Sequence, residues 1–423
     1  MLVEFSVENY LSFLKKQTLS LVASEDEAML DSTFPMPGDS DMRLVKSAVI
    51  YGANASGKSN LLRAISTFKK IVVSSASRMQ QGDKFDLRSF RLNSQSQKEP
   101  TSFEVIFFQN QIRYEYGVVL DRNRVYEEWL IAFPEEDEQN WFDRKYNPDN
   151  PEANNGYEWY FDEKLQGENE IIKKFVRPNS LFLSHAAQNN HPQLTEVFLW
   201  FKDKLNDIDF DDEYTVARIS EDLDFRDRVV NLLKTADIGI SGIEIDKKLH
   251  SLVSGVKQKV ENSQKNNNIN GDKTLALNPL FIRKMNDSDQ EIYFSMEEES
   301  QGTKRLFELA GILINVLEKG EVLIMDELER SFHSVLLKNL VQVFHDPDIN
   351  RSNAQLIFAT HDSTLIDDEI FGLDQIWFLE KDEASASQLY SFLKFEPREY
   401  ETWQTGYLSG RYGAVPFIGG LKI

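Results

Sequence analysis

The sequence predicts an α/β fold that combines a mostly parallel core sheet, an antiparallel β layer and a helical insertion. From residue 291 onward, short apolar runs alternate with helical patterns, which is typical of a parallel sheet. Closely spaced strand patterns between residues 102 and 131 indicate an antiparallel layer. A glycine-rich motif at 52–59 and an acidic motif at 322–327 stand far apart, so we expect a large segment to be inserted within one domain.

The glycine-rich motif reads Gly-Ala-Asn-Ala-Ser-Gly-Lys-Ser, which is the spacing of a phosphate-binding loop. Glycines let the backbone turn so that successive N–H groups face phosphate oxygens, the lysine reaches the β- and γ-phosphates, and the serine hydroxyl binds Mg²⁺. The alternative is a chance match, but an apolar run at 48–51 and helical spacing from Leu61 to Phe68 supply the required strand, loop and helix. We therefore expect ATP and Mg²⁺ to be bound here, by Gly52, Asn54, Gly57, Lys58, Ser59 and Asn60.

Two further motifs follow apolar strand patterns. Asp326 and Glu327 end the run at 322–325, where a carboxylate can hold Mg²⁺ and its neighbour can act as general base toward water. His361 follows the run at 355–359 and can contact the γ-phosphate and the same water. The alternatives are a simple strand end for the carboxylates and a structural or exposed role for the histidine. Their common place after strands favours Asp326 as a metal ligand and Glu327 and His361 as catalytic residues.

A fourth motif, Ser-Gln-Gly-Thr at 300–303, opens a helix. Ser300 can simply cap that helix, which is a common and sufficient role. A helix N-terminus with a hydroxyl and a glycine N–H can also bind a terminal phosphate. We therefore expect Ser300 and Gly302 to form a second anion site.

The remaining patterns divide the chain into three predicted regions: an N-terminal lobe over 1–195, a helical insertion over 196–290 and a C-terminal lobe over 291–423. We expect a polar link over 24–43, a loop-rich stretch over 134–170, and a mobile polar loop over 262–273. The expected strands cover 2–10, 17–22, 102–108, 113–120, 125–131, 180–184, 292–294 and 374–379, and the expected helices begin at Leu194, near Val229, near Leu306 and at 334–345.

Composition sets limits on the class of protein. The chain has 423 residues, 41% of them hydrophobic, and a net charge of −22. It has no cysteine, which excludes a thiol nucleophile and a Cys-zinc site. We find no basic leader and no run of about 18 apolar residues, so we expect a cytoplasmic protein without a membrane span. The negative charge repels nucleic-acid phosphates, and nucleic-acid binding stays an open question.

The order of phosphate loop, Ser-x-Gly-Thr helix start, acidic strand and Thr-His-Asp resembles the ABC-type ATPases of the SMC and RecF kind. Within that group the chain resembles the bacterial RloA or abortive-infection ATPases. This resemblance rests on five stretches, at 7–13, 177–184, 298–304, 326–333 and 410–417. It spans most of the chain outside 205–290.

The resemblance implies an ABC-type P-loop ATPase head that forms a head-to-tail dimer, or a higher oligomer, and closes on ATP. Ser300 and Gly302 of one subunit would complete the site built on Lys58 of the other. It also implies a role in anti-phage defence, with a phage trigger and an effector protein, resembling a nuclease, from a neighbouring gene. Two departures stand out: no glutamine loop is evident, with Phe90-Arg91-Leu92 in its place, and His333-Ser334 replaces the usual Asp-Pro.

Two other functions remain open at this stage. One is a DNA-maintenance ATPase resembling RecF that binds duplex DNA, against which the net charge of −22 counts modestly. The other is a scaffold that binds ATP with negligible turnover, against which Glu327 and His361 argue. The sequence assigns no role to Gly410 through Phe417.

Overall fold

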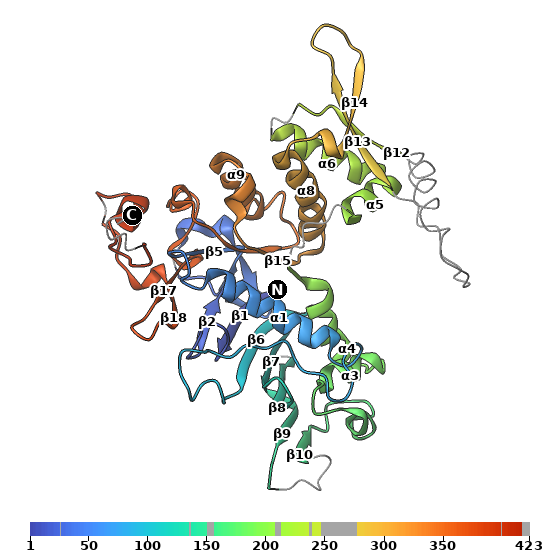
Figure 1. The fold of residues 1–423 in the computed structure, drawn as a ribbon, viewed down its shortest axis with the longest axis vertical. Coiled ribbons are helices and arrows are strands. Elements are labelled where there is room, and N and C mark those ends of the chain that lie inside the picture. The colour runs from blue at the N-terminus through green and yellow to red at the C-terminus, as the bar shows by residue number, and fades with distance from the viewer. Residues whose placement is uncertain are drawn as a thin grey trace, which may run out of the picture. The chain divides into compact units, whose positions relative to one another are not determined.

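The computed structural model describes residues 1–25, 27–134, 137–149, 156–207, 213–236, 239–246, 277–398 and 400–416 (Figure 1). Contacts divide the chain into a larger unit, Met1–Ile208 with Leu317–Ile423, and a smaller unit, Asp209–Val316. The three regions inferred from motifs, with borders at 195/196 and 290/291, therefore stay a prediction. The predicted polar loop over 262–273 lies outside the described residues.

The larger unit contains the predicted core sheet. Its strands run in the order β11-β15-β16-β5-β17-β18, and every neighbouring pair is parallel except β17 with β18. Its central strands β5, β15 and β16 are buried at every residue and are mostly apolar, because a central parallel strand is buried on both faces. The bounds are β5 Ser47–Tyr51, β11 Leu205–Asp207, β15 Val322–Met325, β16 Gln355–Ala359, β17 Ile376–Lys381 and β18 Ser387–Ser391.

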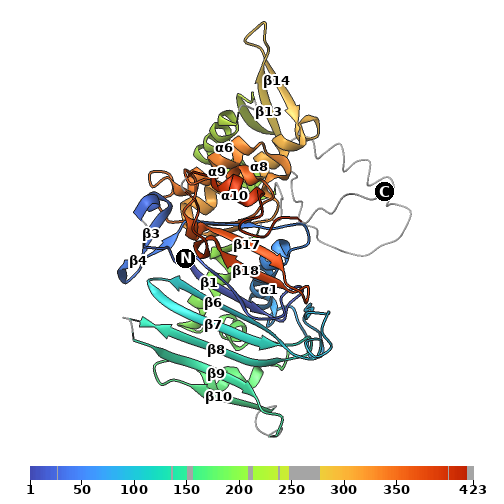
Figure 2. The ribbon, with the colours of Figure 1, turned by 90° about the vertical axis from the view of Figure 1, so that its left-hand side faces the viewer.

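An antiparallel sheet forms the second layer, as predicted. Its order is β10-β9-β8-β7-β6-β1-β2, and Figure 2 shows β6 to β10 side by side. The loop predicted over 134–170 is wrong in part, because β9 and β10 lie within it and bury Trp141, Phe142 and Tyr157. The bounds are β1 Leu2–Glu8, β2 Gln17–Ser20, β6 Thr101–Gln109, β7 Ile112–Leu120, β8 Val125–Phe133, β9 Gln139–Tyr146 and β10 Tyr157–Phe161.

The stretch predicted as a polar link over 24–43 holds a hairpin instead. Strands β3 (Thr33–Met36) and β4 (Asp39–Val45) pair antiparallel. Phe34, Met36 and Leu44 pack with Val3 and Phe108 in a small apolar cluster. Burial of these scattered apolar side chains outweighs the polar composition of the segment.

Helix α1 (Lys58–Ser74) follows the phosphate loop and contacts strands of both sheets, β1 and β16. Its buried face carries Leu61, Ile65 and Phe68 at helical spacing. The Phe68 ring stacks on Phe103 and Tyr116 of the antiparallel sheet, with centroid distances of 5.4 and 5.8 Å. One apolar core therefore joins both sheets to the helix that carries the loop.

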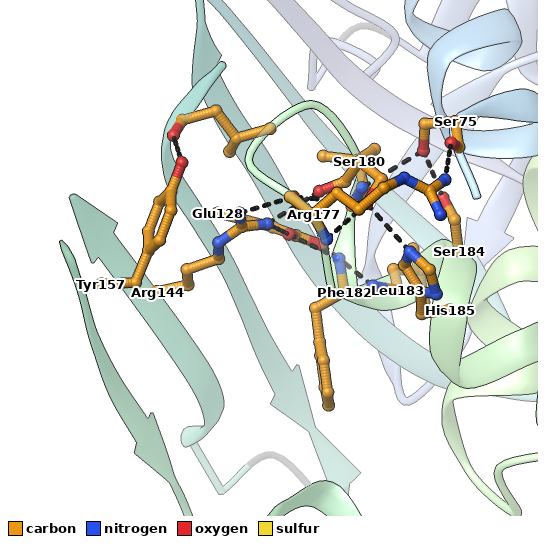
Figure 3. A network of polar contacts seen from close by, with 12 residues as sticks. Ser75, Glu128, Arg144, Tyr157, Arg177, Ser180, Phe182, Leu183, Ser184 and His185 are labelled. Atoms are coloured by element: carbon orange, nitrogen blue, oxygen red, sulfur yellow. Dashed lines mark hydrogen bonds and ion pairs between the residues drawn. The ribbon is translucent and has the colours of Figure 1, made fainter. Parts of the chain in front are cut away.

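The strand predicted over 180–184 is wrong, because α3 (Phe182–Gln188) begins there. A short apolar run does not distinguish a buried strand from a buried helix. The carboxylate of Glu128 on β8 accepts hydrogen bonds from the N–H groups of Phe182 (2.7 Å) and Leu183 (3.0 Å) at the helix start (Figure 3). These bonds satisfy helix N–H groups that have no partner within the helix, and so favour the helix over a strand. Arg144 pairs with the same carboxylate at 3.4 Å and donates to the Ser180 carbonyl at 2.8 Å.

Replacing Glu128 with alanine is expected to lower the free energy of unfolding by about 3–5 kcal/mol, because Arg144 would keep a buried charge without its partner. The matched control is Glu127→Ala on the same strand. Glu127 pairs with Lys145, also on β9, but both side chains are exposed (40% and 62%), so the expected loss is below about 1 kcal/mol. Urea denaturation measures both losses, and equal losses would contradict this account.

The helix predicted from Leu194 is shorter than its apolar spacing indicates. It comprises α4 (Leu194–Leu199) and a π turn over Trp200–Lys204, after which Leu205 begins β11. The C-terminal helix pattern is confirmed by α9 (Ser334–His345). Two short helices complete the larger unit: α2 Asn169–Ile172 and α10 Trp403–Leu408.

The smaller unit combines helices with a sheet. It holds α5 (Glu213–Glu221), α6 (Leu223–Thr235) and most of α8 (Gln301–Lys319), with an antiparallel sheet in the order β12-β13-β14. The strands span Gly242–Asp246, Asn278–Lys284 and Glu291–Ser295, so the strand predicted at 292–294 is confirmed. The sheet is tied to the start of α8 because Arg283 binds the carboxylate of Glu299 at 2.7 and 2.9 Å.

Candidate functional site

A cavity of about 270 Å³ lies at the carboxyl ends of β5, β15 and β16. The register of these strands explains it, because parallel pairing aligns Ile324 with Ile357 and Phe358 with Val49, so the three strands end together. The cavity is lined by Asn54, Ala55, Ser56, Gly57, Lys58, Ser59, Asn60, Asp326, Glu327, Ala359, Thr360 and His361. Motifs that lie far apart in the sequence therefore meet in one place.

Both glycines of the loop lie where neighbouring atoms leave no room for a side chain, so a larger residue would distort the loop. Gly57 has a φ of 118°, and a Cβ there would overlap the Ser387 hydroxyl and approach the Ser12 hydroxyl to 2.8 Å. The Ser387 hydroxyl in turn donates a hydrogen bond to the Ser56 carbonyl (2.5 Å) and lies within hydrogen-bond distance (2.8 Å) of the Ser12 hydroxyl. A Cβ on Gly52, which lies beside the cavity rather than in its lining, would overlap the carbonyl of Leu379.

Lys58 lies over the loop and is only 7% exposed. Its Nζ donates to the carbonyls of Gly52 (2.7 Å) and Ala53 (3.3 Å). Burial lowers the pKa of this amine, while the carboxylates of Asp326, Glu329 and Glu327 act in the opposite direction. A phosphate that enters the cavity would give this buried amine an anionic partner, which favours its charged form.

The other loop residues differ in the hydrogen bonds that their side chains make. Asn54, Ser59 and Asn60 line the cavity, and the Asn60 amide donates to Ser12 at 2.9 Å. The Ser56 hydroxyl is buried and has no hydrogen-bond partner within the described part of the chain. This hydroxyl belongs to the phosphate loop itself and is a donor available to a ligand.

Asp326 and Glu327 are exposed at the cavity, as the strand pattern predicts. Glu327 has a φ of 50°, in the left-handed region that a glutamate adopts only at a cost of roughly 1–3 kcal/mol. Such strain is concentrated at functional sites. Among the described residues, no group of three or more His, Cys, Asp and Glu side chains is arranged to hold a metal. A magnesium ion here would need the serine hydroxyl, one carboxylate and substrate phosphates, which is its usual mode of binding.

Sequence reasoning missed Glu329. Its carboxylate accepts a hydrogen bond from the backbone N–H of His361 at 2.7 Å, and so joins the acidic motif to the histidine segment. Its second oxygen is buried without a partner within the described residues. The third acid in Asp-Glu-Leu-Glu was the available signal, but only the fold shows what it contacts.

The family described as "AAA domain, putative AbiEii toxin, Type IV TA system" matches residues 47–367, which is well over half of the chain. The chain belongs to this family. The matched range contains the phosphate loop, the acidic motif and His361, so the cavity lies within the AAA domain. Membership assigns the chain to P-loop ATPases, a class that binds nucleotide and usually Mg²⁺.

Other comparisons add little. No curated protein matches the chain. The SMC head domain from Thermotoga maritima is 12% identical, with a TM-score of 0.40 over 92% of this chain and 98% of that one. An SmcHead bound to the C-winged helix domain of ScpA is also 12% identical, with a TM-score of 0.38 over 92% and 97%. Likeness at this level carries no functional conclusion. No described helix of this AAA family member is long and apolar enough to cross a membrane.

Ser300 and Gly302 lie at the start of α8 in the smaller unit of this AAA family member. The Ser300 hydroxyl accepts a hydrogen bond from the Thr303 N–H at 3.1 Å, which is the helix cap considered as the alternative. This cap does not test the second anion site, which stays a prediction. His333 likewise caps α9, because its ring accepts from the Val335 N–H at 3.3 Å.

The C-terminal segment from Gly410 to Pro416 has a structural role. Tyr412 is buried among Phe378, Phe392 and Phe395. Its carbonyl accepts from the Tyr390 hydroxyl at 2.9 Å. These contacts fasten the segment to β17 and β18, and β17 pairs directly with β5, the strand before the phosphate loop. Phe417 lies outside the described residues.

Proposed function

We propose that this chain is an ABC-type ATPase that hydrolyses ATP and, as a homo-oligomer, controls a partner effector in anti-phage defence. The observation that carries the proposal is the cavity in which Lys58, Asp326, Glu327 and His361 meet. Each of these residues has a distinct task in phosphoryl transfer to water.

The residues present fit MgATP. The loop supplies N–H donors, a buried amine and the unpaired Ser56 hydroxyl for phosphate oxygens. Ser59 and Asp326 would hold Mg²⁺, with Asn54 and Asn60 beside the phosphates. When bound, the metal would neutralise charge on the phosphate oxygens. The tight packing at Gly52 and Gly57 keeps this donor set in place before ligand arrives, which lowers the entropy lost on binding.

Hydrolysis requires a base that accepts a proton from the attacking water and a second group that orients this water. Glu327 follows Asp326 at the cavity and is suited to accept the water proton. His361, from the next strand, is suited to contact the γ-phosphate and the water from another side. Both side chains are exposed at the cavity, where water has access.

Glu329 is proposed to position His361 rather than to touch the substrate. Glu329→Ala removes the acceptor of the His361 N–H and is expected to lower kcat for phosphate release by about tenfold or more, with little change in KM. Glu329→Gln keeps a carbonyl oxygen as acceptor and should retain most of the activity. Steady-state phosphate-release kinetics compare the variants, and equal losses in both would show that the charge, not the hydrogen bond, matters.

Oligomer formation and the defence role rest on the sequence resemblance and on the family description. We propose that Ser300 and Gly302 of the partner subunit complete each ATP site in a head-to-tail dimer. The family description names a putative toxin of a type IV toxin–antitoxin system, which supports a role in controlling another cellular component.

The defence role is tested by expressing the chain with its neighbouring genes. We expect a neighbour-encoded effector to copurify in the presence of ATP and Mg²⁺, and phage plating to fall. Lys58→Ala should restore plating, whereas Lys174→Ala, at an exposed lysine in the same unit, should not. If no neighbour binds and Lys58→Ala leaves plating unchanged, the defence role is refuted.

A further inference from the structure

A second and larger cavity, of about 520 Å³, lies outside the ATP site and carries a group of basic side chains. It is formed by the loop between α1 and β6 and by the turn between β7 and β8. Arg88, Arg91 and Lys98 come from the loop, and Arg122 comes from the turn. We call these four residues the basic cluster. All four are exposed, and the volume of this open cavity falls in the range of small-ligand sites.

The basic cluster has no structural explanation in its own surroundings. Within the described part of the chain, none of its four side chains makes a hydrogen bond or an ion pair. The acidic lining residues are engaged elsewhere: Asp121 accepts from the N–H groups of Asn123 (2.7 Å) and Arg124 (2.8 Å), and Glu99 accepts from Gln95 (2.8 Å). Four basic and two acidic side chains thus line one cavity, which leaves the cavity net positive although the chain carries a net charge of −22.

The loop that carries the cluster is held in place by a buried side chain. Asn9, only 3% exposed, donates to the carbonyls of Ser96 (2.8 Å), Glu99 (2.9 Å) and Pro100 (3.1 Å). Its own carbonyl oxygen accepts from the Phe90 N–H at 3.1 Å. The N–H of Phe85 donates to the Arg122 carbonyl at 2.9 Å, which joins the loop to the turn. The backbone of the cavity is therefore organised before any ligand binds.

We propose that the basic cluster binds the phosphate groups of a nucleotide-type ligand. Guanidinium groups donate paired hydrogen bonds to phosphate oxygens, and three arginines in one open cavity can contact more than one phosphate. The phosphates can belong to a free nucleotide or to the backbone of a nucleic-acid strand. Arg88 and Arg91 also line a neighbouring cavity with Ser12 and with Asn60, a residue that lines the ATP site as well.

The test compares two double variants with the same net charge. Arg91→Glu with Arg122→Glu reverses two members of the basic cluster. Arg78→Glu with Lys174→Glu makes the same change at exposed residues outside the cavity. Both are made in a Lys58→Ala background, so that the phosphate loop does not contribute. Thermal unfolding verifies that each variant is folded.

Two fluorescent probes separate the sources of phosphate: a labelled single strand of about 12 nucleotides and a labelled ADP. Anisotropy is measured over a range of salt. We expect the cluster variant to bind one probe at least about tenfold more weakly, and the control variant to change it less than about threefold. For the strand, the slope of log K against log salt should fall by about 1.4. Loss of strand binding assigns a nucleic-acid ligand, and loss of ADP binding assigns a free nucleotide. Equal losses in both variants, or no binding of either probe, would overturn the proposal.

Discussion

Glu327→Gln is expected to lower the rate of phosphate release by roughly 10²–10⁴-fold while ATP binding stays close to that of the wild type. Glutamine keeps the size and shape of the side chain but does not accept the proton of the attacking water. The backbone strain at Glu327 is also retained, so the change is confined to the chemistry. Phosphate release at saturating ATP and equilibrium nucleotide binding measure the two effects separately.

The matched control is Glu369→Gln, which makes the same chemical change at an exposed residue outside the cavity. It should leave turnover unchanged. A Glu327→Gln variant as active as the wild type would remove Glu327 from the catalytic role. A wild-type protein that binds ATP but releases no phosphate would instead favour the ATP-bound scaffold.

Ser300→Arg and Lys58→Ala are each expected to abolish turnover alone and to restore part of it when the two variants are mixed. In a head-to-tail dimer, a mixed pair contains one site with both Lys58 and Ser300 intact. Random pairing at equal concentration makes half of the dimers mixed, so roughly a quarter of all sites are complete. Phosphate release from the mixture should approach that fraction of the wild-type rate if each site works alone.

Loss of a helix cap must be separated from loss of a binding site. Ser300→Arg removes the acceptor of the Thr303 N–H, which costs about 1 kcal/mol of stability. Thermal unfolding measures that loss, and Ser288→Arg, at an exposed turn in the same unit, controls for the added side chain. If Ser300→Arg is folded and inactive but the mixture shows no recovery, the shared site is excluded.

The parts of the site that follow strands could be predicted from the sequence. An apolar run long enough for one strand, ending in Gly52, Asp326 or Thr360, fixes where those residues lie once the strands are parallel. The glycine spacing fixes the loop itself. Local patterns therefore indicate the class of ligand and place the phosphate loop, Asp326 and Thr360 at one edge of the sheet.

Contacts between distant segments could not be predicted in this way. The start of α3 depends on Glu128, which is far away in sequence, and the apolar run alone favoured a strand. The contact of Glu329 is with the N–H of His361, which follows β16 and is 32 residues away in the sequence. The basic cluster combines arginines from a loop and a turn that show no pattern in the sequence. Each case needs the folded chain to bring the partners together.

Calorimetric titration of the wild-type protein with MgATP tests most directly whether the cavity at the phosphate loop binds ATP. We expect the phosphate loop to bind one nucleotide per chain, with a dissociation constant between about 1 µM and 1 mM, and any nucleotide bound at the basic cluster to be unaffected by Lys58→Ala. Lys58→Ala should weaken binding at least about tenfold, because it removes the amine that lies over the phosphate loop, whereas Lys174→Ala should not. Absence of binding to the wild type, or equal binding to Lys58→Ala, would contradict the assignment of the cavity as an ATP site.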